Sequence, residues 1–519
     1  PSHMQTRERA RIRSLFLSAF LSAKRTGRGV GECYQRVFLD FRPMQSASAE
    51  EAKRDLAVIV LAAGVGTRMK SKTPKVLHQI CGRPMIAWIY DAVSAVERGR
   101  VLIVLGEGAE VVHQLLPQDT EVVIQERQLG TGDAVRACRE RLEGFGGDIL
   151  IMYGDTPLVT GDELEGLLAA HVAAAPACTL MTVSLKDPSH YGRVCRDADG
   201  RVTSIIEDRD ASDEEKKICE VNAGVYVFDS AMLWPALAEV GSDNVQGEAY
   251  LTDVAGILAS GGETVLAHEV PDPLAVLGVN SRVDMAMAGE AMRRRLLARH
   301  MLEGVTIEDP ASTYIDAGVR VGRDTVIRPM SVISGDTSIG EDCEIGPSAT
   351  VVDSTIDDGV RLVSSHVVEA EVAAGCSVGP FAYLRPGTRL QAGAKAGTFV
   401  EIKNSRVGQG AKIPHLSYVG DAEIGAGTNI GAGNITANYD GIRKHRTVIG
   451  SGVNTGADTV FVAPVVVGDG SMTGAGSVIC EDVPGGGLGI ARSRQRNVEG
   501  YARRKLEESG GEKEEKPEK

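Results

Sequence analysis

The 519-residue sequence contains no apolar run approaching the roughly 20 residues that a membrane-spanning helix needs. Its nine cysteines lie far apart and form no C-x-x-C pair, which argues against a zinc site and against a disulfide framework. We therefore expect reduced thiols and a cytoplasmic location. The formal net charge of -14 disfavours general nucleic-acid binding, because the overall field repels a polyanion, so any phosphate must be bound locally.

Aromatic residues are also scarce, at 4% of the chain, whereas hydrophobic residues reach 43% and glycines number 61. The core must therefore be largely aliphatic, which suits a repeat fold with tight corners. Because single cores rarely grow beyond about 250–300 residues, this length predicts at least two domains.

The two ends of the chain carry few signals of packed structure. Residues 1–54 begin with what resembles an expression-tag remnant and continue with an Arg-rich stretch, which we expect to be a dispensable extension, disordered or locally helical. Residues 491–519 form a C-terminal segment, whose charged tail from Glu507 to Lys519 we expect to be disordered.

Residues 55–280 alternate short apolar runs with amphipathic stretches, which predicts a mostly parallel sheet covered by helices. The expected buried strands are Leu56–Leu61, Val101–Leu105, Asp148–Met152 and Val225–Phe228. Residues 281–304 then predict a linker helix. We expect Val283, Met287, Met292 and Leu296 on its apolar face and Arg293 to Arg295 on its solvent side.

Residues 305–490 change to a six-residue period. Aliphatic residues recur at steps of six, with single-residue slips, at Val321, Ile327, Ile333, Ile339, Ile345, Val351, Ile356, Leu362, Val367, Val372, Val378, Leu384, Leu390, Ala396, Ile402, Val407, Ile413, Val419, Ile424 and Ile430. Neither an α-helix nor a plain strand keeps this period on one face, so we predict a parallel β-helix of hexapeptides. The repeat breaks at Asn438–Arg446, which predicts an extruded loop of the kind that carries binding functions.

A glycine-containing loop follows the first predicted strand, with the sequence L-A-A-G-V-G-T-R-M from Leu61 to Met69 and Lys75 shortly after it. Backbone N–H groups there can approach phosphate oxygens, while Arg68 and Lys75 can neutralise them. The third glycine of the dinucleotide fingerprint is missing and no G-K-[ST] follows, which disfavours Rossmann and P-loop sites. A simple strand-to-helix turn is the plainer alternative.

The segment Tyr153-Gly-Asp-Thr-Pro ends another predicted strand and places Asp155 at the carboxyl edge of the sheet, where ligands of open α/β sheets bind. Asp155 could instead cap the following helix. Thr160 and Glu163 form a better capping box there, which leaves Asp155 available for a hard cation such as Mg²⁺.

With these motifs the chain resembles the bacterial family of bifunctional N-acetylglucosamine-1-phosphate uridylyltransferase / glucosamine-1-phosphate N-acetyltransferases. Further segments that match the family are Gln125–Thr131, Tyr191–Arg193, Asn244–Gly247, Tyr250–Asp253 and Gly278–Asn280. The resemblance spans roughly Asp55 to Arg496. It implies a Rossmann-like α/β nucleotidyltransferase domain followed by a left-handed parallel β-helix, with UDP-N-acetylglucosamine, a precursor of peptidoglycan and lipopolysaccharide, as the product.

The resemblance also implies roles for residues of the first domain, with UTP and N-acetylglucosamine-1-phosphate as substrates. Asp155 and Asn280 match Mg²⁺ ligands, and Arg68 and Lys75 match catalytic cations on the phosphates. Substrate-binding positions are matched on the nucleotide side by Leu61, Ala62, Ala63, Gly64, Gln125, Gly130 and Thr131, and on the sugar side by Gly192, Glu207 and Asn222. Tyr153 and Gly154 are further substrate-binding positions. Val65, Asp133 and Ala223 depart from the family pattern.

In the predicted β-helix, Arg385 and Lys403 each follow a core residue and stand 18 residues apart. That spacing is one coil of a triangular β-helix, so the two cations should stack on one wall and form a phosphate site, although solvated surface charges are the common alternative. His415 by its spacing alone is more easily a solvated histidine than a base.

For the second domain the resemblance implies acetyl transfer from acetyl-CoA to glucosamine-1-phosphate, with His415 as the catalytic base. Tyr418, Asn429 and Lys444 match sugar-phosphate positions beside Arg385 and Lys403, and the positions matched to acetyl-CoA are Asn438, Tyr439, Ala457, Ala475 and Arg492. Ala457 replaces an expected serine. Direct acyl transfer needs no cysteine.

Two rival interpretations are a monofunctional sugar nucleotidyltransferase with a structural β-helix and a non-enzymatic scaffold. His415 and the Asn438–Arg446 loop argue against the first, and Arg68, Lys75 and Asp155 against the second. The family resemblance further implies a homotrimer. From the negative net charge and the missing apolar run we expect neither a nucleic-acid partner nor a membrane partner.

Overall fold

The computed structural model describes residues 55–64, 66–96, 98–106, 110–117 and 120–509. The expectations for residues 1–54 and for Val65 lie outside these ranges, as does the tail beyond residue 509. Within the described residues, no helix is long and apolar enough to cross a membrane. The cysteines in the same ranges are all free thiols, as the sequence predicts.

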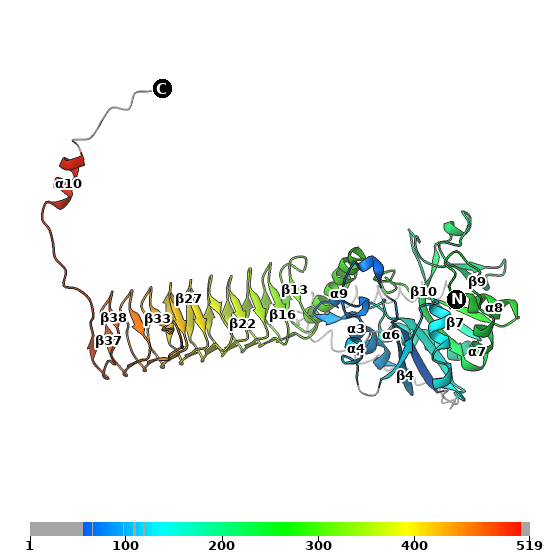
Figure 1. Cartoon of the computed structure of the whole chain (residues 1–519), viewed down its shortest axis with the longest axis horizontal. Helices are drawn as coiled ribbons and strands as arrows, with labels where there is room; N and C mark the ends of the chain where they lie inside the picture. The colour runs from blue at the N-terminus through cyan, green and yellow to red at the C-terminus, as the bar shows by residue number, and fades with distance from the viewer. Residues whose placement is uncertain (1–54, 65, 97, 107–109, 118–119, 510–519) are drawn as a thin grey trace, which may run out of the picture. The chain divides into compact units, whose positions relative to one another are not determined.

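The nucleotidyltransferase part is built on a nine-stranded sheet (Figure 1). Its main path runs in the order β11 (Val265–Glu269), β7 (Cys178–Ser184), β10 (Glu220–Asp229), β6 (Asp148–Tyr153), β1 (Leu56–Leu61), β4 (Arg100–Gly106) and β5 (Glu121–Gln125). Off this path lie β8 (Arg193–Arg196) and β9 (Val202–Ile206), and a separate ribbon pairs β2 (Gln79–Ile80) with β3 (Arg83–Pro84).

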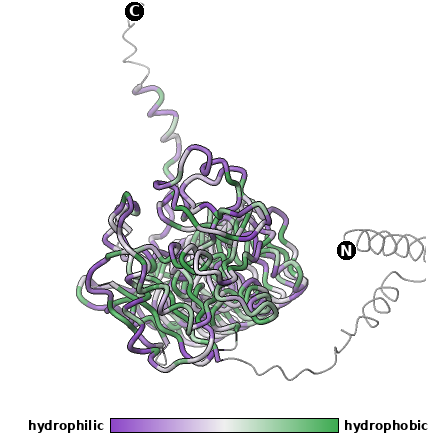
Figure 2. The backbone as a smooth tube through the Cα atoms, turned by 90° about the vertical axis from the view of Figure 1, so that its right-hand side faces the viewer, coloured by the Kyte–Doolittle hydropathy of each residue, from purple (hydrophilic) through white to green (hydrophobic). Residues whose placement is uncertain are grey.

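The predicted parallel strands pair as expected, since β1 runs parallel to both β4 and β6. The strand β10 is an exception, because it runs antiparallel to β6 and to β7. The helices and 3-10 turns of this part are α3 (Met85–Ala95), α4 (Glu110–His113), α5 (Thr131–Arg136), α6 (Gly161–Ala174), α7 (Ser230–Glu239), α8 (Asp253–Ser260), η1 (Thr67–Met69), η2 (Lys75–Leu77), η3 (Arg139–Leu142) and η4 (Glu215–Lys217). Aliphatic side chains pack on both faces of the sheet, and Figure 2 shows the hydrophobic segments gathered inside.

The helix α9 (Arg282–Leu302) is preceded by its N-cap residue Ser281, whose side chain forms a capping box with Asp284. The expected apolar face is partly wrong: Val283 and Met287 are exposed, and the buried stripe consists of Ala288, Ala291, Met292, Leu296, Leu297 and His300.

The expected solvent side of α9 is also partly wrong. Arg294 is exposed, but Arg293 stacks on the Tyr314 ring and Arg295 donates to the Leu158 carbonyl. Long arginine side chains can lie along a surface and still reach carbonyls or rings, so a run of three arginines need not be a solvated face.

From residue 306 onward the chain winds into the left-handed parallel β-helix that the hexapeptide period predicts, with three walls of short parallel strands (Figure 1). The first wall holds β12 (Thr306–Ile307), β15 (Val326–Ile327), β18 (Glu344–Ile345), β21 (Arg361–Leu362), β24 (Ser377–Val378), β27 (Lys395–Thr398) and β30 (Lys412–His415). The second holds β13 (Tyr314–Ile315), β16 (Val332–Ser334), β19 (Thr350–Val352), β22 (His366–Val368), β25 (Tyr383–Leu384), β28 (Glu401–Lys403), β31 (Tyr418–Gly420), β33 (Ile435–Ala437), β35 (Val460–Val462) and β38 (Val478–Ile479). The third holds β14 (Arg320–Val321), β17 (Ser338–Ile339), β20 (Thr355–Ile356), β23 (Glu371–Val372), β26 (Arg389–Leu390), β29 (Arg406–Val407), β32 (Ala422–Ile424), β34 (Thr447–Ile449) and β36 (Val465–Val467).

The hexapeptide residues point inward and form one aliphatic core. All of the predicted positions are buried except Val321, which is half-buried near the start of the solenoid. Two further strands, β37 (Met472–Thr473) and β39 (Leu488–Gly489), pair near the end of the solenoid.

The described part of the C-terminal segment contains α10 (Tyr501–Ser509), so the expectation of disorder from Glu507 onward is wrong for residues 507–509. Ion pairs join Arg503 to Glu507 and Lys505 to Glu508, one helical turn apart, and such pairs favour a helix.

Candidate active sites

A cavity of about 700 Å³ opens at the carboxyl ends of β1 and β6, a size typical of small-molecule sites. The structure brings all the site residues predicted for the first domain to its wall. These are Leu61, Ala62, Ala63, Gly64, Arg68, Lys75, Gln125, Gly130, Thr131, Tyr153, Gly154, Asp155, Gly192, Glu207, Asn222 and Asn280.

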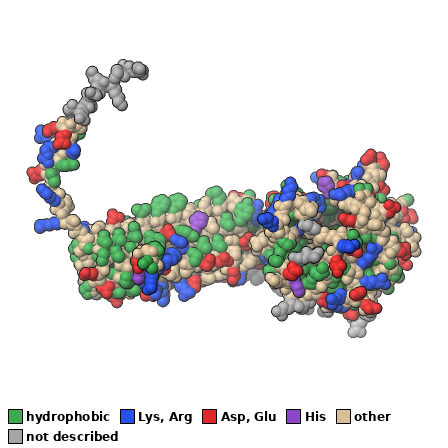
Figure 3. Space-filling view, viewed as in Figure 1, with side chains coloured by type: hydrophobic (Ala, Val, Ile, Leu, Met, Phe, Trp, Pro, Cys, Tyr) green, Lys and Arg blue, Asp and Glu red, His purple; other side chains and the backbone are tan. Residues whose placement is uncertain are grey.

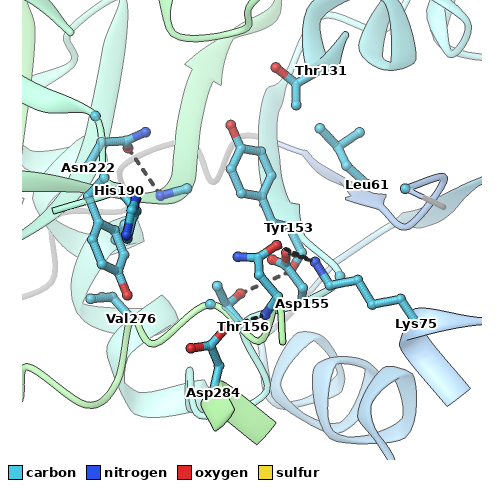
Figure 4. Close-up of a pocket in the computed structure, with 18 of the residues that line it drawn as sticks. Leu61, Lys75, Thr131, Tyr153, Asp155, Thr156, His190, Asn222, Val276 and Asp284 are labelled. Carbon is cyan, nitrogen blue, oxygen red and sulfur yellow. Dashed lines mark hydrogen bonds and ion pairs between the residues drawn. The ribbon is translucent and has the colours of Figure 1, made fainter. Parts of the chain in front are cut away.

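Lys75 is a nearly buried cation on the wall of this cavity, and its ammonium group has two side-chain acceptors. It follows Pro74 at the start of η2, is 9% exposed, and donates from Nζ to Asp155 Oδ2 at 2.5 Å and to Asn280 Oδ1 at 2.8 Å (Figure 4). The Val279 N–H donates to the Asp155 carbonyl, and Asp284 in the α9 cap accepts from the Asn280 N–H. Two chain segments are thereby held so that a carboxylate and an amide oxygen converge on one cationic nitrogen.

This convergence fits a hard divalent cation, because carboxylate and amide oxygens are the ligands that Mg²⁺ accepts, with substrate phosphates completing the set. Among the described residues, no cluster of three or more His, Cys, Asp or Glu side chains could hold a metal ion. A metal here would therefore depend on the substrate for further ligands. Arg68, in η1 after the glycine loop, is exposed on the cavity wall.

The nucleotide side of the cavity contains amide groups held in place by neighbours. Gln125 Nε2 donates to Asp133 Oδ2 at 2.8 Å. Asp133, which departs from the family pattern, therefore orients Gln125, a predicted nucleotide-binding residue. Gln128 lines the cavity and donates to the Ala63 carbonyl at 2.7 Å. Sequence reasoning missed Gln128, although it lies within the matched segment Gln125–Thr131.

On the sugar side, Glu207 is largely buried and accepts a hydrogen bond from the Thr252 hydroxyl at 3.1 Å. Burial raises the pKa of Glu207 despite that bond, and the charges of Asp253, Asp210 and Asp208 raise it further. Asp187, Ser189, His190 and Asp284 are further wall residues that the sequence did not indicate, and Thr156 and Tyr191 lie in matched segments but were given no role.

The second predicted site lies on the β-helix, where Arg385 and Lys403 occupy neighbouring coils in the same register, as their spacing predicts. Arg385 pairs with Glu401 at 2.7 Å, and Lys403 lies 3.9 Å from Asp421. Both cations therefore have a carboxylate partner, which keeps them in place beside each other.

The extruded loop carries Lys444 to this cluster. Asn438 donates to Asp421 Oδ2, and the hydrogen bond and charge of nearby Lys403 lower the pKa of Lys444. Burial alone would raise the pKa of Asp421, but hydrogen bonds from Asn404 and Asn438, with Lys403 and Lys444, lower it. Two ammonium groups facing one carboxylate leave a local excess of positive charge, which suits a phosphate.

His415 ends β30 and is exposed, opposite Thr398 of the preceding coil. Leu416 takes a left-handed conformation (φ 48°) directly after it, and Tyr418 begins the next wall. His415 and Tyr418 thus flank one corner of the solenoid. Asn429 is exposed one coil further on, bridged to Lys412 of the His415 strand.

The positions matched to acetyl-CoA divide into two groups. Arg492 Nη1 donates to the Ala475 carbonyl at 2.7 Å, and the Ala457 carbonyl accepts from Gly476, so these three lie together. Asn438 and Tyr439 instead follow β33, whereas Ala457 precedes the neighbouring strand β35. A single chain therefore does not bring the five residues to one point.

Comparison with known proteins supports both domains. Residues 58–240 match the MobA-like NTP transferase domain, and residues 318–353 match the bacterial transferase hexapeptide (six repeats). The chain is 48% identical to the bifunctional protein GlmU of Corynebacterium efficiens, over 86% of this chain and 94% of that protein. It is also 48% identical to the bifunctional protein GlmU of Mycobacterium tuberculosis, over 87% and 93% of the two chains.

These relatives favour the bifunctional interpretation of the sequence over the monofunctional one, because the match runs through the nucleotidyltransferase domain and the β-helix alike. A Rossmann-like nucleotidyltransferase domain and a hexapeptide acyltransferase domain stand in one chain, and the chain belongs to the family of bifunctional GlmU transferases.

Proposed function

We propose that the cavity of the first domain transfers a uridylyl group from UTP to N-acetylglucosamine-1-phosphate. A phosphate oxygen of the sugar attacks the α-phosphorus of UTP and pyrophosphate leaves, so positioning and charge neutralisation supply the catalysis. The observation that carries this proposal is the convergence of Asp155 and Asn280 on the Lys75 ammonium at the carboxyl edge of the sheet.

Asp155 and Asn280 would hold Mg²⁺, which when bound neutralises charge on the substrate phosphates. Lys75 and Arg68 line the same cavity and would bind phosphate oxygens. Gln125, Gly130 and Thr131 would hold the nucleotide, and Glu207 and Asn222 the sugar.

In the second domain, the phosphate of glucosamine-1-phosphate would bind Arg385, Lys403 and Lys444, with Tyr418 and Asn429 on the sugar. His415, as a neutral imidazole, would accept the proton lost from the amine nitrogen as that nitrogen adds to the thioester carbonyl of acetyl-CoA. Collapse of the adduct expels CoA thiolate and leaves the N-acetyl product. Asn438, Tyr439, Ala457, Ala475 and Arg492 would bind acetyl-CoA.

The active assembly would be a homotrimer in which neighbouring β-helices complete each acetyl-transfer site. The division of the acetyl-CoA positions into two groups supports this, as do exposed apolar side chains on the β-helix, including Phe381, Phe399 and Leu416. Phe381 and Phe399 stack at 5.3 Å, and Figure 3 shows hydrophobic side chains gathered on the face of the β-helix in view. Sedimentation should give a trimer, and a stable monomer with full acetyl transfer would contradict it.

The two assignments are tested by a crossover between two variants of the full chain. Asp155→Asn should weaken Mg²⁺ binding and lower uridylyl transfer by orders of magnitude, yet leave acetyl transfer nearly unchanged. His415→Ala should lower acetyl transfer by roughly 10²–10⁴-fold, the loss expected for a positioned general base, and spare uridylyl transfer.

The readouts are pyrophosphate release from UTP with N-acetylglucosamine-1-phosphate, and free CoA from acetyl-CoA with glucosamine-1-phosphate. Each variant serves as the folding control for the other. Loss of both reactions in either variant, in protein that keeps its native melting profile, would disprove the two-site assignment.

A further inference from the structure

Tyr226 is a buried residue of the nucleotidyltransferase part that lies outside the cavity wall and has no role so far. It is fully buried in β10, its ring lies edge-on to Tyr153 with centroids 6.4 Å apart, and it stacks on Phe228 at 5.8 Å. Its hydroxyl accepts a hydrogen bond from Asn222 Nδ2 at 2.6 Å. A buried phenol group thus contacts a residue that faces the sugar side of the cavity.

The local backbone defines which way the Asn222 amide points. The pairing of β10 with β7 shifts register between Asn222 and Tyr226, and the Gly224 N–H within that irregularity donates to Asn222 Oδ1 at 3.1 Å. Gly224 has φ 72°, and a Cβ there would come within 2.4 Å of the Tyr153 ring. The oxygen is therefore held by Gly224 and the nitrogen by Tyr226, which leaves one N–H and one lone pair for a ligand.

The Tyr226 ring is held by its neighbours. It contacts the Tyr153 ring edge-on and stacks on Phe228, and it is fully buried. In Figure 4 the Tyr153 ring stands between Asn222 and Leu61. The Tyr226 hydroxyl is therefore kept where the Asn222 amide can reach it.

The direction of the Asn222–Tyr226 bond follows from the groups themselves. The Asn222 nitrogen can only donate, so the Tyr226 oxygen accepts. The phenol oxygen thus fixes the amide nitrogen, and the Gly224 N–H fixes the amide oxygen.

We propose that Tyr226 is a positioning residue that orients the Asn222 amide toward the sugar phosphate. The inference rests on the proposed uridylyl transfer. Because Tyr226 and Gly224 occupy one N–H and one lone pair of the amide, the remaining N–H and lone pair are already directed at the sugar side before the sugar binds.

The test uses Tyr226→Phe in the full chain, which keeps the ring packing and removes the hydroxyl. The KM for N-acetylglucosamine-1-phosphate should rise about tenfold, the effect of leaving a part-buried amide N–H without its partner. The KM for UTP should stay within about twofold of the wild type, because the lost hydroxyl contacts Asn222 on the sugar side. Acetyl transfer should not change.

The matched control is Thr179→Val, in the neighbouring strand β7. Thr179 is fully buried, pairs with Val227 of β10 and bonds His171 Nδ1 at 2.9 Å, so this variant also loses one buried hydroxyl but does not touch the cavity. It should lower the melting temperature comparably and leave both substrate KM values within about twofold.

A double variant, Asn222→Ala with Tyr226→Phe, covers the case in which Tyr226→Phe alone fails to fold, because removing both partners leaves no buried group unpaired. Its sugar KM should equal that of Asn222→Ala alone, since the hydroxyl acts through the amide. Additive effects of the two substitutions, or an unchanged sugar KM in folded Tyr226→Phe, would overturn the inference and leave the uridylyl assignment intact. A wild-type protein without pyrophosphate release would overturn the proposed function, and this inference with it.

Discussion

At the scale of single residues, Glu207 shows the cost of building a polar site inside a domain. Its carboxylate is largely buried beside Asp253, Asp210 and Asp208, and burial is the main cause of its raised pKa. A carboxyl group whose pKa is higher in the folded than in the unfolded state destabilises the fold when it is ionised. That penalty is absent below the ordinary pKa of 4.5, grows as pH rises from there through the folded pKa, and is complete only above the folded pKa.

Glu207→Gln should therefore stabilise the protein at pH 7, because it removes the buried charge and keeps an oxygen that can accept from Thr252. We expect the melting transition of this domain to rise by about 2–4 °C, the shift that about 1 kcal/mol gives in a domain of this size. Melting curves at pH 7 and pH 4 check the sign, since the gain should vanish at pH 4. Uridylyl transfer should fall in the same variant. A variant that melts lower at pH 7 would contradict the assigned cause of the pKa shift.

At the scale of elements, the loop between β33 and β34 is a small folded unit. Asp440 Oδ1 accepts from the backbone of Ile442 and Arg443, and Oδ2 accepts from His445 Nε2 at 2.7 Å. The Arg443 backbone bond, the His445 bond and the Ile442 backbone bond lower the pKa of Asp440 to about 2. Tyr439 and Lys444 pair across the loop, so one carboxylate holds the turn that places Lys444.

Replacing Asp440 by Ala should release this turn and raise the KM for glucosamine-1-phosphate by about tenfold, because the loop must then order itself when the phosphate binds. Initial rates of CoA release against glucosamine-1-phosphate measure the effect, and pyrophosphate release should be unchanged. Asp353→Ala is the control, since Asp353 likewise accepts one backbone N–H, from Asp336, in a corner without site residues. Equal effects of the two variants would show that Asp440 has no special role in placing Lys444.

At the scale of the whole molecule, the two proposed sites draw on separate stretches of one chain. The site residues of the cavity lie between Leu61 and Asn280, those of the β-helix between Arg385 and Arg492, and α9 lies between the two stretches. No residue of residues 1–54 belongs to either set.

Deleting residues 1–54 should accordingly leave uridylyl transfer and acetyl transfer within a few-fold of the full chain. The comparison requires equal concentrations of both proteins and both product assays. If either activity disappeared while the truncated protein kept its native melting profile, the first 54 residues would have a function that the sequence motifs do not reveal.

The local signals of the sequence predicted much of the molecule. The six-residue period predicted the β-helix core residue by residue, because each inward side chain must repeat once per wall. The motifs after strands predicted the cavity wall, since the carboxyl ends of parallel strands meet at one edge of a sheet. Patterns did not reveal that β10 runs antiparallel, because a strand buried on both faces shows the same apolar run in either direction.

By itself, the sequence determined the two fold classes, the core positions of the solenoid and a set of residues that line the cavity, because these follow from periodicity and motif spacing. Only the tertiary structure decided which side chains meet. The Lys75 bridge joins residues 80 and 205 positions apart, and the bond from Asn222 to Tyr226 depends on a strand irregularity. It also decided that α9 buries Ala288 rather than Met287, because the packed neighbours and not the hydrophobic pattern alone select the buried face.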